Sequence, residues 1–283
     1  MPIRVSCPVC GRIETYEPEE EDIRTAHERG LASISFFHGD HALVVYFDAN
    51  EQVRRTSVVK SMGEVPATAA PPLSDLISTV GAENLAYLMA AVVSGGRIVM
   101  ASYSPELAQN IVASLRELVK PLELPVFVVG EAGEAAALRE MPRPSAIIVR
   151  SSLLPEVRKA VKDMPIVDLS TPMKLSKEGR KGLKVILDAI DHALRLRDES
   201  YRMAYLNARL TRLRTLAENA LRLLGSVNMI RESDFKKAVA PDITSDELAF
   251  LYFALNEFTD MEIIPLPRPS PFLPQSLLIR RKT

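Results

Sequence analysis

The sequence predicts a multidomain α/β protein: a small antiparallel β-rich unit, a parallel α/β middle of three layers, a long helix and a winged-helix-like end. Three observations support this fold class. Two turns rich in Cys and His lie near the N-terminus, short apolar strands alternate with helices in the middle, and no Gly or Pro interrupts residues 183–224. Alternating strands and helices are typical of a parallel sheet covered on both faces. The predicted domains are residues 1–62, 73–172, 174–225 and 226–283.

Length and composition restrict the class of protein further. The chain has 283 residues and 47% hydrophobic residues, enough to bury more than one core. A formal net charge of −1 argues against a chain devoted wholly to nucleic acid or to anionic membranes. No basic segment precedes an apolar run, and no uncharged apolar run reaches about 20 residues, so we expect a cytoplasmic protein that spans no membrane. The absence of Trp and the abundance of Arg and Glu are typical of a thermophile.

The N-terminal unit contains the strongest motif, a CPVCG turn at residues 7–11 that is paired with an HGDH turn at residues 38–41. These turns hold both cysteines and two of the four histidines. In a reducing compartment a CxxC pair favours metal or redox chemistry over a structural disulfide. Two thiolates and two imidazoles would form a closed, structural zinc site. The candidate ligands are Cys7, Cys10, His38 and His41.

A second interpretation of these turns stays open. Two cysteines can be small buried apolar residues, and histidines can simply occupy a β-turn. Whether the two turns share one metal also stays open. Because a closed site leaves no position for a substrate, the motif indicates architecture more than activity.

The remaining elements of this unit follow from alternation and turn residues. Strands are expected on both sides of the Cys turn, an acidic helix after them, and then three strands in an antiparallel meander. The ranges are 2–7 and 12–16 for the first strands, 17–29 for the helix, and 33–37, 42–47 and 53–59 for the meander. Residues 63–72 contain Gly63, Pro66, Pro71 and Pro72 and are predicted to be a linker.

The middle segment is predicted to alternate helix and strand throughout. Ser104, Pro105 and Glu106 mark one helix start, with a cap, a proline in the first turn and an acidic residue at the positive end. The expected helices are 84–93, 105–119, 134–140 and 154–162, and the expected strands are 97–102, 126–130, 146–150 and 166–169.

The third segment carries two apolar stripes at helical spacing. One follows residues 183, 187, 190, 194, 201, 205 and 208, and the other follows residues 206, 210, 213, 217, 220 and 224. They predict either one long helix or two helices joined near residues 198–201. The stripes would either pack within the chain or form a homodimer. Both stay open, because only sustained heptads would specify a dimeric coiled coil.

The C-terminal segment has the element order of a winged helix. Helices are expected at residues 233–239 and 245–258, and strands at 261–266 and 276–281. Residues 241–262 contain acidic side chains and no Lys or Arg, so phosphates would be repelled and we expect no DNA reading here. Residues 174–237 are basic instead, which indicates either a solvated face or contact with an acidic surface such as the third helix of this end or residues 17–22.

Ligands of open parallel sheets bind at the carboxyl ends of the strands. No phosphate loop and no catalytic triad occurs there, and helix caps and loop roles explain the polar residues at these ends. An enzyme site at this edge is the alternative. The residues concerned are Ser102, Ser104, Gly130, Ser151, Ser152 and Asp168.

Several segments between residues 80 and 170 resemble the core of the DENN domain. They are Glu83-Asn84-Leu85, which opens an apolar helix, Gly96-Arg97-Ile98-Val99-Met100-Ala101-Ser102, Pro144-Ser145-Ala146-Ile147-Ile148-Val149-Arg150 and Pro165-Ile166-Val167-Asp168-Leu169. That family joins an antiparallel longin-like unit to such an α/β unit. The resemblance implies contact with small GTPases, often with nucleotide exchange. The CPVCG turn and the C-terminal end are not part of the family's pattern, so no functional residue is carried over.

The sequence therefore predicts a non-catalytic scaffold or regulatory protein. It would act through protein–protein contacts, with itself or with a partner such as a small GTPase, and zinc would be its cofactor. Two alternatives remain: an enzyme with its site at the carboxyl ends of the α/β strands, and a nucleic-acid-associated factor that uses the basic helical face.

Overall fold

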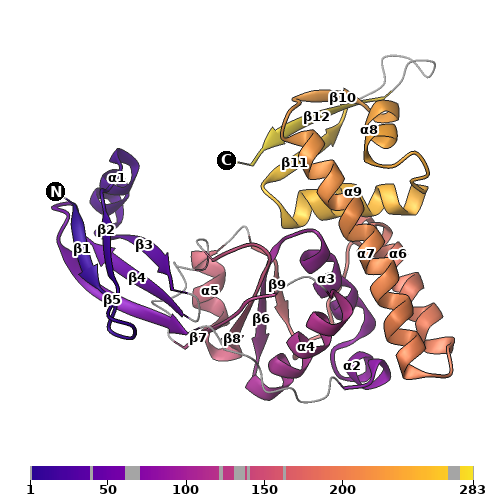
Figure 1. Cartoon of the computed structure of the whole chain (residues 1–283), viewed down its shortest axis with the longest axis horizontal. Helices are drawn as coiled ribbons and strands as arrows, with labels where there is room; N and C mark the ends of the chain where they lie inside the picture. The colour runs from indigo at the N-terminus through magenta and orange to yellow at the C-terminus, as the bar shows by residue number, and fades with distance from the viewer. Residues whose placement is uncertain are drawn as a thin grey trace.

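A computed structural model gives four sheets, three of them antiparallel and one parallel, among the described residues. The N-terminal antiparallel unit, the parallel sheet and the C-terminal unit follow one another across the molecule (Figure 1). This arrangement confirms an α/β fold with small antiparallel sheets and a parallel four-stranded sheet. The structure describes residues 2–38, 41–60, 71–120, 124–130, 138, 141–161, 164–266 and 275–282.

The N-terminal unit consists of a hairpin, a helix and a meander. Strands β1 (Ile3–Ser6) and β2 (Ile13–Tyr16) pair antiparallel, and helix α1 (Glu20–Arg29) follows. Strands β3 (Ala32–Phe37), β4 (His41–Phe47) and β5 (Val53–Lys60) form the expected meander in the order β3-β4-β5. Strand β4 is buried on both faces, which is why its sequence reads as a nearly continuous apolar run.

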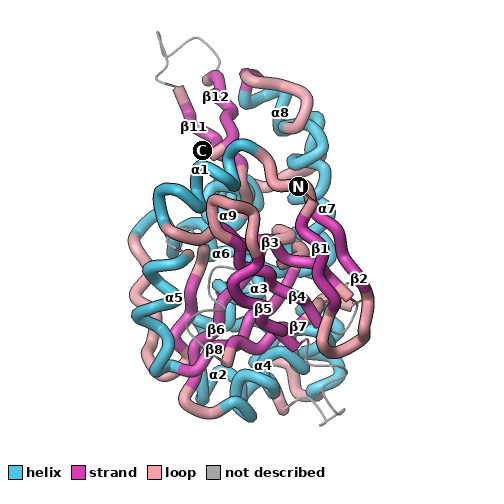
Figure 2. The backbone as a smooth tube through the Cα atoms, turned by 90° about the vertical axis from the view of Figure 1, so that its left-hand side faces the viewer, coloured by secondary structure: helices cyan, strands magenta, loops and turns pink. Residues whose placement is uncertain are grey.

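The two faces of β4 pack against different neighbours. Leu43, Val45 and Phe47 form a small cluster with Ile3 and Cys7 of the hairpin region. Ala42 and Val44, with Val59 of β5, pack instead against the parallel sheet. Figure 2, viewed from the side of the N-terminal unit, shows the antiparallel strands lying over the parallel ones. The meander therefore connects the hairpin to the rest of the molecule.

The parallel sheet has the strand order β7-β8-β6-β9. Its strands are β6 (Arg97–Ser102), β7 (Val126–Val129), β8 (Ser145–Arg150) and β9 (Ile166–Asp168). Its helices are α2 (Leu73–Val80), α3 (Ala82–Val93), α4 (Pro105–Leu118) and α5 (Leu154–Ala160), with the short 3₁₀ helix η2 (Ser151–Leu153) before α5. The predicted helix at 134–140, apart from Leu138, lies outside the described residues, and so does the predicted linker apart from Pro71 and Pro72.

Alternate side chains of β6 divide the sheet into two faces. Ile98 and Met100 join the core that contains α3 and α4, whereas Val99 and Ala101 join the cluster that contains α5 and the meander. Both faces are thus covered, as expected, but α5 shares the second face with antiparallel strands. The alternation of side chains along a strand explains this division.

The segment predicted to be one long helix or two forms two helices, α6 (Lys177–Arg195) and α7 (Glu199–Leu224). Asp198 caps α7 by accepting a hydrogen bond from the Ser200 amide at 2.7 Å, and this cap separates the helices. The second apolar stripe is buried in the core of the chain itself. This stripe is therefore part of the core of the monomer and not an exposed surface for a homodimer. The buried stripe consists of Leu206, Leu210, Leu213, Ala217, Ala220 and Leu224.

The C-terminal unit contains strand β10 (Met229–Arg231), helices α8 (Glu232–Val239) and α9 (Ser245–Phe258), and strands β11 (Met261–Pro265) and β12 (Ser276–Arg281). The three strands pair antiparallel in the order β10-β12-β11. The sequence did not predict strand β10. The stretch between β11 and β12, where a winged helix would have its wing loop, lies almost entirely outside the described residues, and the description as winged-helix-like stays a prediction.

One hydrophobic core extends from α2 through α6 and α7 to β12. The middle, helical and C-terminal segments therefore share their buried residues, and the predicted domain boundaries at residues 173 and 225 stay predictions. Among the described residues, no single helix is long and apolar enough to cross a membrane. Helices α2 and α3 meet that length and composition only when they are taken together, and the chain bends by 107° between them.

Candidate metal centre

The Cys turn closes the hairpin between β1 and β2. The Cys7 amide donates a hydrogen bond to the Arg12 carbonyl at 2.8 Å, and the Gly11 amide donates one to the Cys7 carbonyl at 2.9 Å. Gly11 has a φ of 72°, a conformation that a residue with a Cβ seldom adopts. The CPVCG sequence therefore folds into a tight loop with both cysteines near its ends.

The His turn joins β3 to β4 and lies opposite the Cys turn. The His38 amide donates a hydrogen bond to the His41 carbonyl at 2.8 Å, which holds the two histidines at the ends of the turn. Gly39 and Asp40 lie outside the described residues. Because β1, β2, β3 and β4 belong to two sheets that pack together, the two turns meet at one end of this unit.

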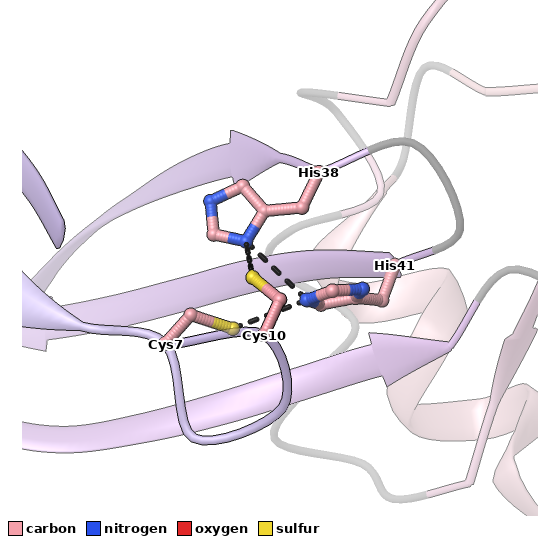
Figure 3. Close-up of side chains that lie close together, drawn as sticks. All are labelled: Cys7, Cys10, His38 and His41. Carbon is pink, nitrogen blue, oxygen red and sulfur yellow. Dashed lines mark hydrogen bonds between the residues drawn. The ribbon is translucent and has the colours of Figure 1, made fainter. Parts of the chain in front are cut away.

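The four predicted ligand residues converge on one point (Figure 3). The Cys7 Sγ lies 3.1 Å from His41 Nε2, and the Cys10 Sγ lies 3.2 Å from His38 Nδ1. The two ring nitrogens, His38 Nδ1 and His41 Nε2, lie 3.3 Å apart. One ligand atom from each of the four residues lies within 4.8 Å of every other. The four residues could therefore hold a single metal ion.

The donor set and its spacing fit a tetrahedral zinc ion. Bonds of about 2.3 Å to sulfur and about 2.0–2.1 Å to nitrogen place neighbouring ligand atoms of a tetrahedron about 3.3–3.8 Å apart. The observed nitrogen–sulfur and nitrogen–nitrogen distances lie slightly below or within that range. Four protein ligands complete the coordination, so a metal bound here would have no open position for a substrate.

The surroundings of Cys7 favour its thiolate form, which is the form that binds metals. Burial raises the pKa of the Cys7 thiol, but hydrogen bonds from the Cys10 and Val9 amides, with smaller contributions from His41 and His38, lower it to about 6. Cys7 is buried and Cys10 is exposed. The turn thus stabilises negative charge on the inner sulfur.

Glu14 is a neighbour of the site that the sequence pattern did not reveal. Its Oε1 lies 3.0 Å from His38 Nε2, the ring nitrogen that faces away from the cysteines. Metal-bound histidines commonly donate their second nitrogen to a carboxylate. Glu14 is a single acidic residue on a half-exposed strand, and only the position of His38 in space distinguishes it from other surface acids.

The polar residues at the carboxyl ends of the parallel strands are used mainly in local turns. Ser102 Oγ donates to the Ser104 carbonyl at 2.7 Å, and Ser104 Oγ accepts from the Leu107 amide at 3.3 Å as the cap of α4. Asp168 Oδ1 accepts from the Ser170 amide at 3.0 Å. Ser151, at the start of η2, has a buried Oγ without a hydrogen-bond partner. Gly130 directly follows β7, and Ser152 lies within η2.

The helices after β6 and β8 cover opposite faces of the sheet, so the carboxyl ends of these neighbouring strands form the topological switch point. A ligand of the enzyme alternative would bind there. The side chains of Ser102, Ser104 and Asp168 are already occupied by capping and turn hydrogen bonds. The edge therefore provides few groups for chemistry among the described residues.

The basic helical face contacts the acidic third helix of the C-terminal unit. Lys184 Nζ lies 2.7 Å from Asp246 Oδ2, and Arg212 Nε lies 3.2 Å from Glu247 Oε1. Arg212 also lies 3.1 Å from Asp242. Two of the basic residues, Lys184 and Arg212, therefore contact the acidic helix and the turn before it, while others such as Lys174 are exposed. The exposed pair of Lys184 and Asp246 contributes little stability, whereas the Glu247 carboxylate is buried beside Arg212.

Helix α9 packs against its neighbours along one side. Phe250, Leu251 and Ala254 are fully buried, and a Cβ added to Gly182 of α6 would lie only 2.3 Å from the Phe253 Cβ. The two helices are therefore in direct contact. Ser245 and Glu257 of α9 remain exposed.

In comparisons with protein-family models and with curated proteins, neither a family model nor a relative matches this chain.

Proposed function

We propose that this protein is a non-catalytic scaffold or regulatory protein whose N-terminal unit is held together by one structural zinc ion. The observation that carries the proposal is the closed set of four ligand atoms, all within 4.8 Å of one another. Zinc with four protein ligands cross-links the chain and leaves no position for a substrate. Its ligands would be Cys7, Cys10, His38 and His41.

The hairpin provides a physical reason for a metal. Strands β1 and β2 each contain four residues and pair only with each other. An isolated two-stranded hairpin is marginally stable in water. A zinc ion that joins its turn to the turn between β3 and β4 would fix the hairpin to the meander.

The same hairpin offers a surface for a protein partner. Val9 and Ile13 are 53% and 54% exposed, and both lie beside the metal ligands. Apolar side chains on a rigid turn gain contact area with little loss of conformational entropy when a partner binds. Because the antiparallel meander packs on an α/β unit, as the resemblance to the DENN domain implies, small GTPases are the first partner class to test.

The C-terminal unit would serve the same kind of role. Its element order and its β10-β12-β11 sheet support the interpretation as winged-helix-like. Contact between α9 and α6, with acidic side chains along α9, favours protein contacts over DNA reading. In this proposal the basic segment positions the unit within the chain.

Elemental analysis tests the metal. Protein purified without chelators should contain about one zinc ion per chain, and the Cys10→Ser/His38→Ala variant should contain none. A Val9→Ser variant alters the same turn without removing a ligand, so it should keep its zinc. A wild-type protein without metal contradicts the proposal.

Binding measurements test the partner. The full chain should bind a member of a panel of small GTPases, and the Val9→Ser/Ile13→Ser variant should bind it at least about tenfold more weakly. The Leu31→Ser variant, which changes an exposed apolar residue outside the hairpin turn, is the matched control. Equal binding by the wild type and the hairpin variant contradicts a role for this surface, and sequence-specific binding of a DNA duplex at physiological salt contradicts the scaffold role.

A further inference from the structure

The two histidines of the metal centre face the cysteines with different ring nitrogens. His38 directs Nδ1 toward Cys10 Sγ at 3.2 Å, whereas His41 directs Nε2 toward Cys7 Sγ at 3.1 Å. These are also the two nitrogens that lie 3.3 Å apart (Figure 3). The site is therefore asymmetric, and each ring requires its own tautomer to offer a lone pair.

Glu14 explains how the His38 ring is held. Its Oε1 lies 3.0 Å from His38 Nε2, and the His38 side chain is only 2% exposed. A carboxylate accepts hydrogen bonds and donates none, so the shared proton lies on Nε2. The lone pair on Nδ1 is then directed toward the centre of the four ligands.

Arg12 in turn holds Glu14. The Arg12 Nε lies 3.0 Å from the same Glu14 Oε1, and the Arg12 carbonyl accepts the Cys7 amide hydrogen bond. The ion pair therefore connects the Cys turn to the His turn from outside the ligand set. Two thiolates balance the charge of a divalent ion, and the Arg12–Glu14 pair adds no net charge to them.

We infer that Glu14 is a positioning residue, which fixes the Nε2–H tautomer of His38 and so gives the metal one imidazole bound through Nδ1 and one bound through Nε2. This inference rests on the proposed zinc site and specifies its chemistry. Carboxylates in this position orient the imidazole and raise its basicity, and their removal typically lowers metal affinity 10- to 100-fold.

Two variants of Glu14 separate orientation from charge. Glu14→Ala removes the acceptor and should weaken zinc binding by about 10- to 100-fold in competition with a chromophoric chelator. Glu14→Gln keeps an acceptor oxygen and should lose less affinity than Glu14→Ala. Glu17→Ala removes an exposed acid from the same segment and should bind zinc as tightly as the wild type.

Long-range ¹H–¹⁵N correlation spectra of the zinc-loaded full chain provide the direct readout. The expected spectrum shows His38 metal-bound at Nδ1 with a proton on Nε2, and His41 metal-bound at Nε2. In Glu14→Ala the His38 pattern should shift or broaden while the His41 pattern stays. Binding of both rings through Nε2, or equal zinc affinity of Glu14→Ala and Glu17→Ala, overturns the inference while leaving the zinc site standing. A wild-type protein that binds no zinc overturns both.

Discussion

The N-terminal hairpin and the C-terminal core are held together in different ways. Around the hairpin, the buried cluster is small and includes Cys7, one of the candidate metal ligands. From α2 to β12, a single core joins helices and strands across most of the chain. A small unit that buries little apolar surface needs a cross-link, whereas a large core does not. In the proposed function, the metal would therefore be a local requirement of the first region.

The largest expected effect comes from removing a ligand. Cys7→Ser should abolish zinc binding and open the hairpin, because structural zinc sites contribute on the order of 10 kcal/mol to folding. Limited proteolysis should then cut within residues 2–60 and leave a stable fragment that contains α3 and α7. Val9→Ser changes the same turn without loss of a ligand and should stay resistant. Equal resistance of Cys7→Ser and the wild type would remove the distinction between the two regions.

The next effect belongs to the large core. Phe250 is fully buried on α9, so Phe250→Ala should lower the free energy of unfolding by about 3–5 kcal/mol. Chemical denaturation measures this loss, and the zinc content should not change. Tyr103→Ala alters an aromatic side chain that is 80% exposed and should change stability by less than about 0.5 kcal/mol. Release of zinc by Phe250→Ala would mean that the two regions fold as one.

A smaller effect tests the contact between α6 and α9. In Gly182→Ala the new methyl group would lie 2.3 Å from the Phe253 Cβ, so the helices must separate, at a cost of about 1–3 kcal/mol. Gly179→Ala, on the same helix, meets its nearest atom at 3.4 Å and should be neutral or stabilising. Thermal unfolding of both variants shows whether the loss of stability comes from the contact with Phe253 or from any substitution of a glycine in α6. Equal melting temperatures would contradict the close packing.

The smallest expected effect is the pH dependence at the start of α9. Burial raises the pKa of the Glu247 carboxyl, but hydrogen bonds from Thr244 and the Arg212 guanidinium outweigh it and lower the pKa below its ordinary value. A lowered folded-state pKa contributes stability above the unfolded-state value of about 4.3, and this stability is lost as the pH falls through the folded-state value.

Glu247→Gln should therefore cost about 1 kcal/mol near pH 7, and the difference from the wild type should shrink as the pH falls below about 4. Denaturation at several pH values measures it. Glu178→Gln, which changes an exposed residue of α6, is the matched control. A difference that grows toward low pH would reverse the sign and contradict the assignment.

Local patterns in the sequence predict much of the fold. Alternation along 33–59 predicts the meander, and short apolar runs such as 97–102 predict the parallel strands, since each depends on side chains only a few residues apart. The three-residue strand β10 is too short to show a period and depends on pairing with β12. The break between α6 and α7 depends on the Asp198 cap. The apolar spacing is nearly continuous across this cap, so the spacing alone does not show the break.

The ligands of the candidate site were predictable because Cys and His are rare in this chain and grouped in two turns. The residues that orient them were not. Glu14 and Arg12 are ordinary surface residues in the sequence, and only the folded hairpin brings them to His38. The contact between α9 and α6 was also not predictable. Helical spacing shows which side of α9 is apolar, but not which helix packs against it.

Hydrogen exchange with and without a chelator tests the central claim most directly, because it follows both regions in one sample. After zinc removal, amides of residues 2–16 should exchange at least about tenfold faster, while those of residues 183–194 in α6 should keep their rates. Unchanged exchange in the hairpin after loss of the metal, or equal acceleration in both regions, would contradict the account.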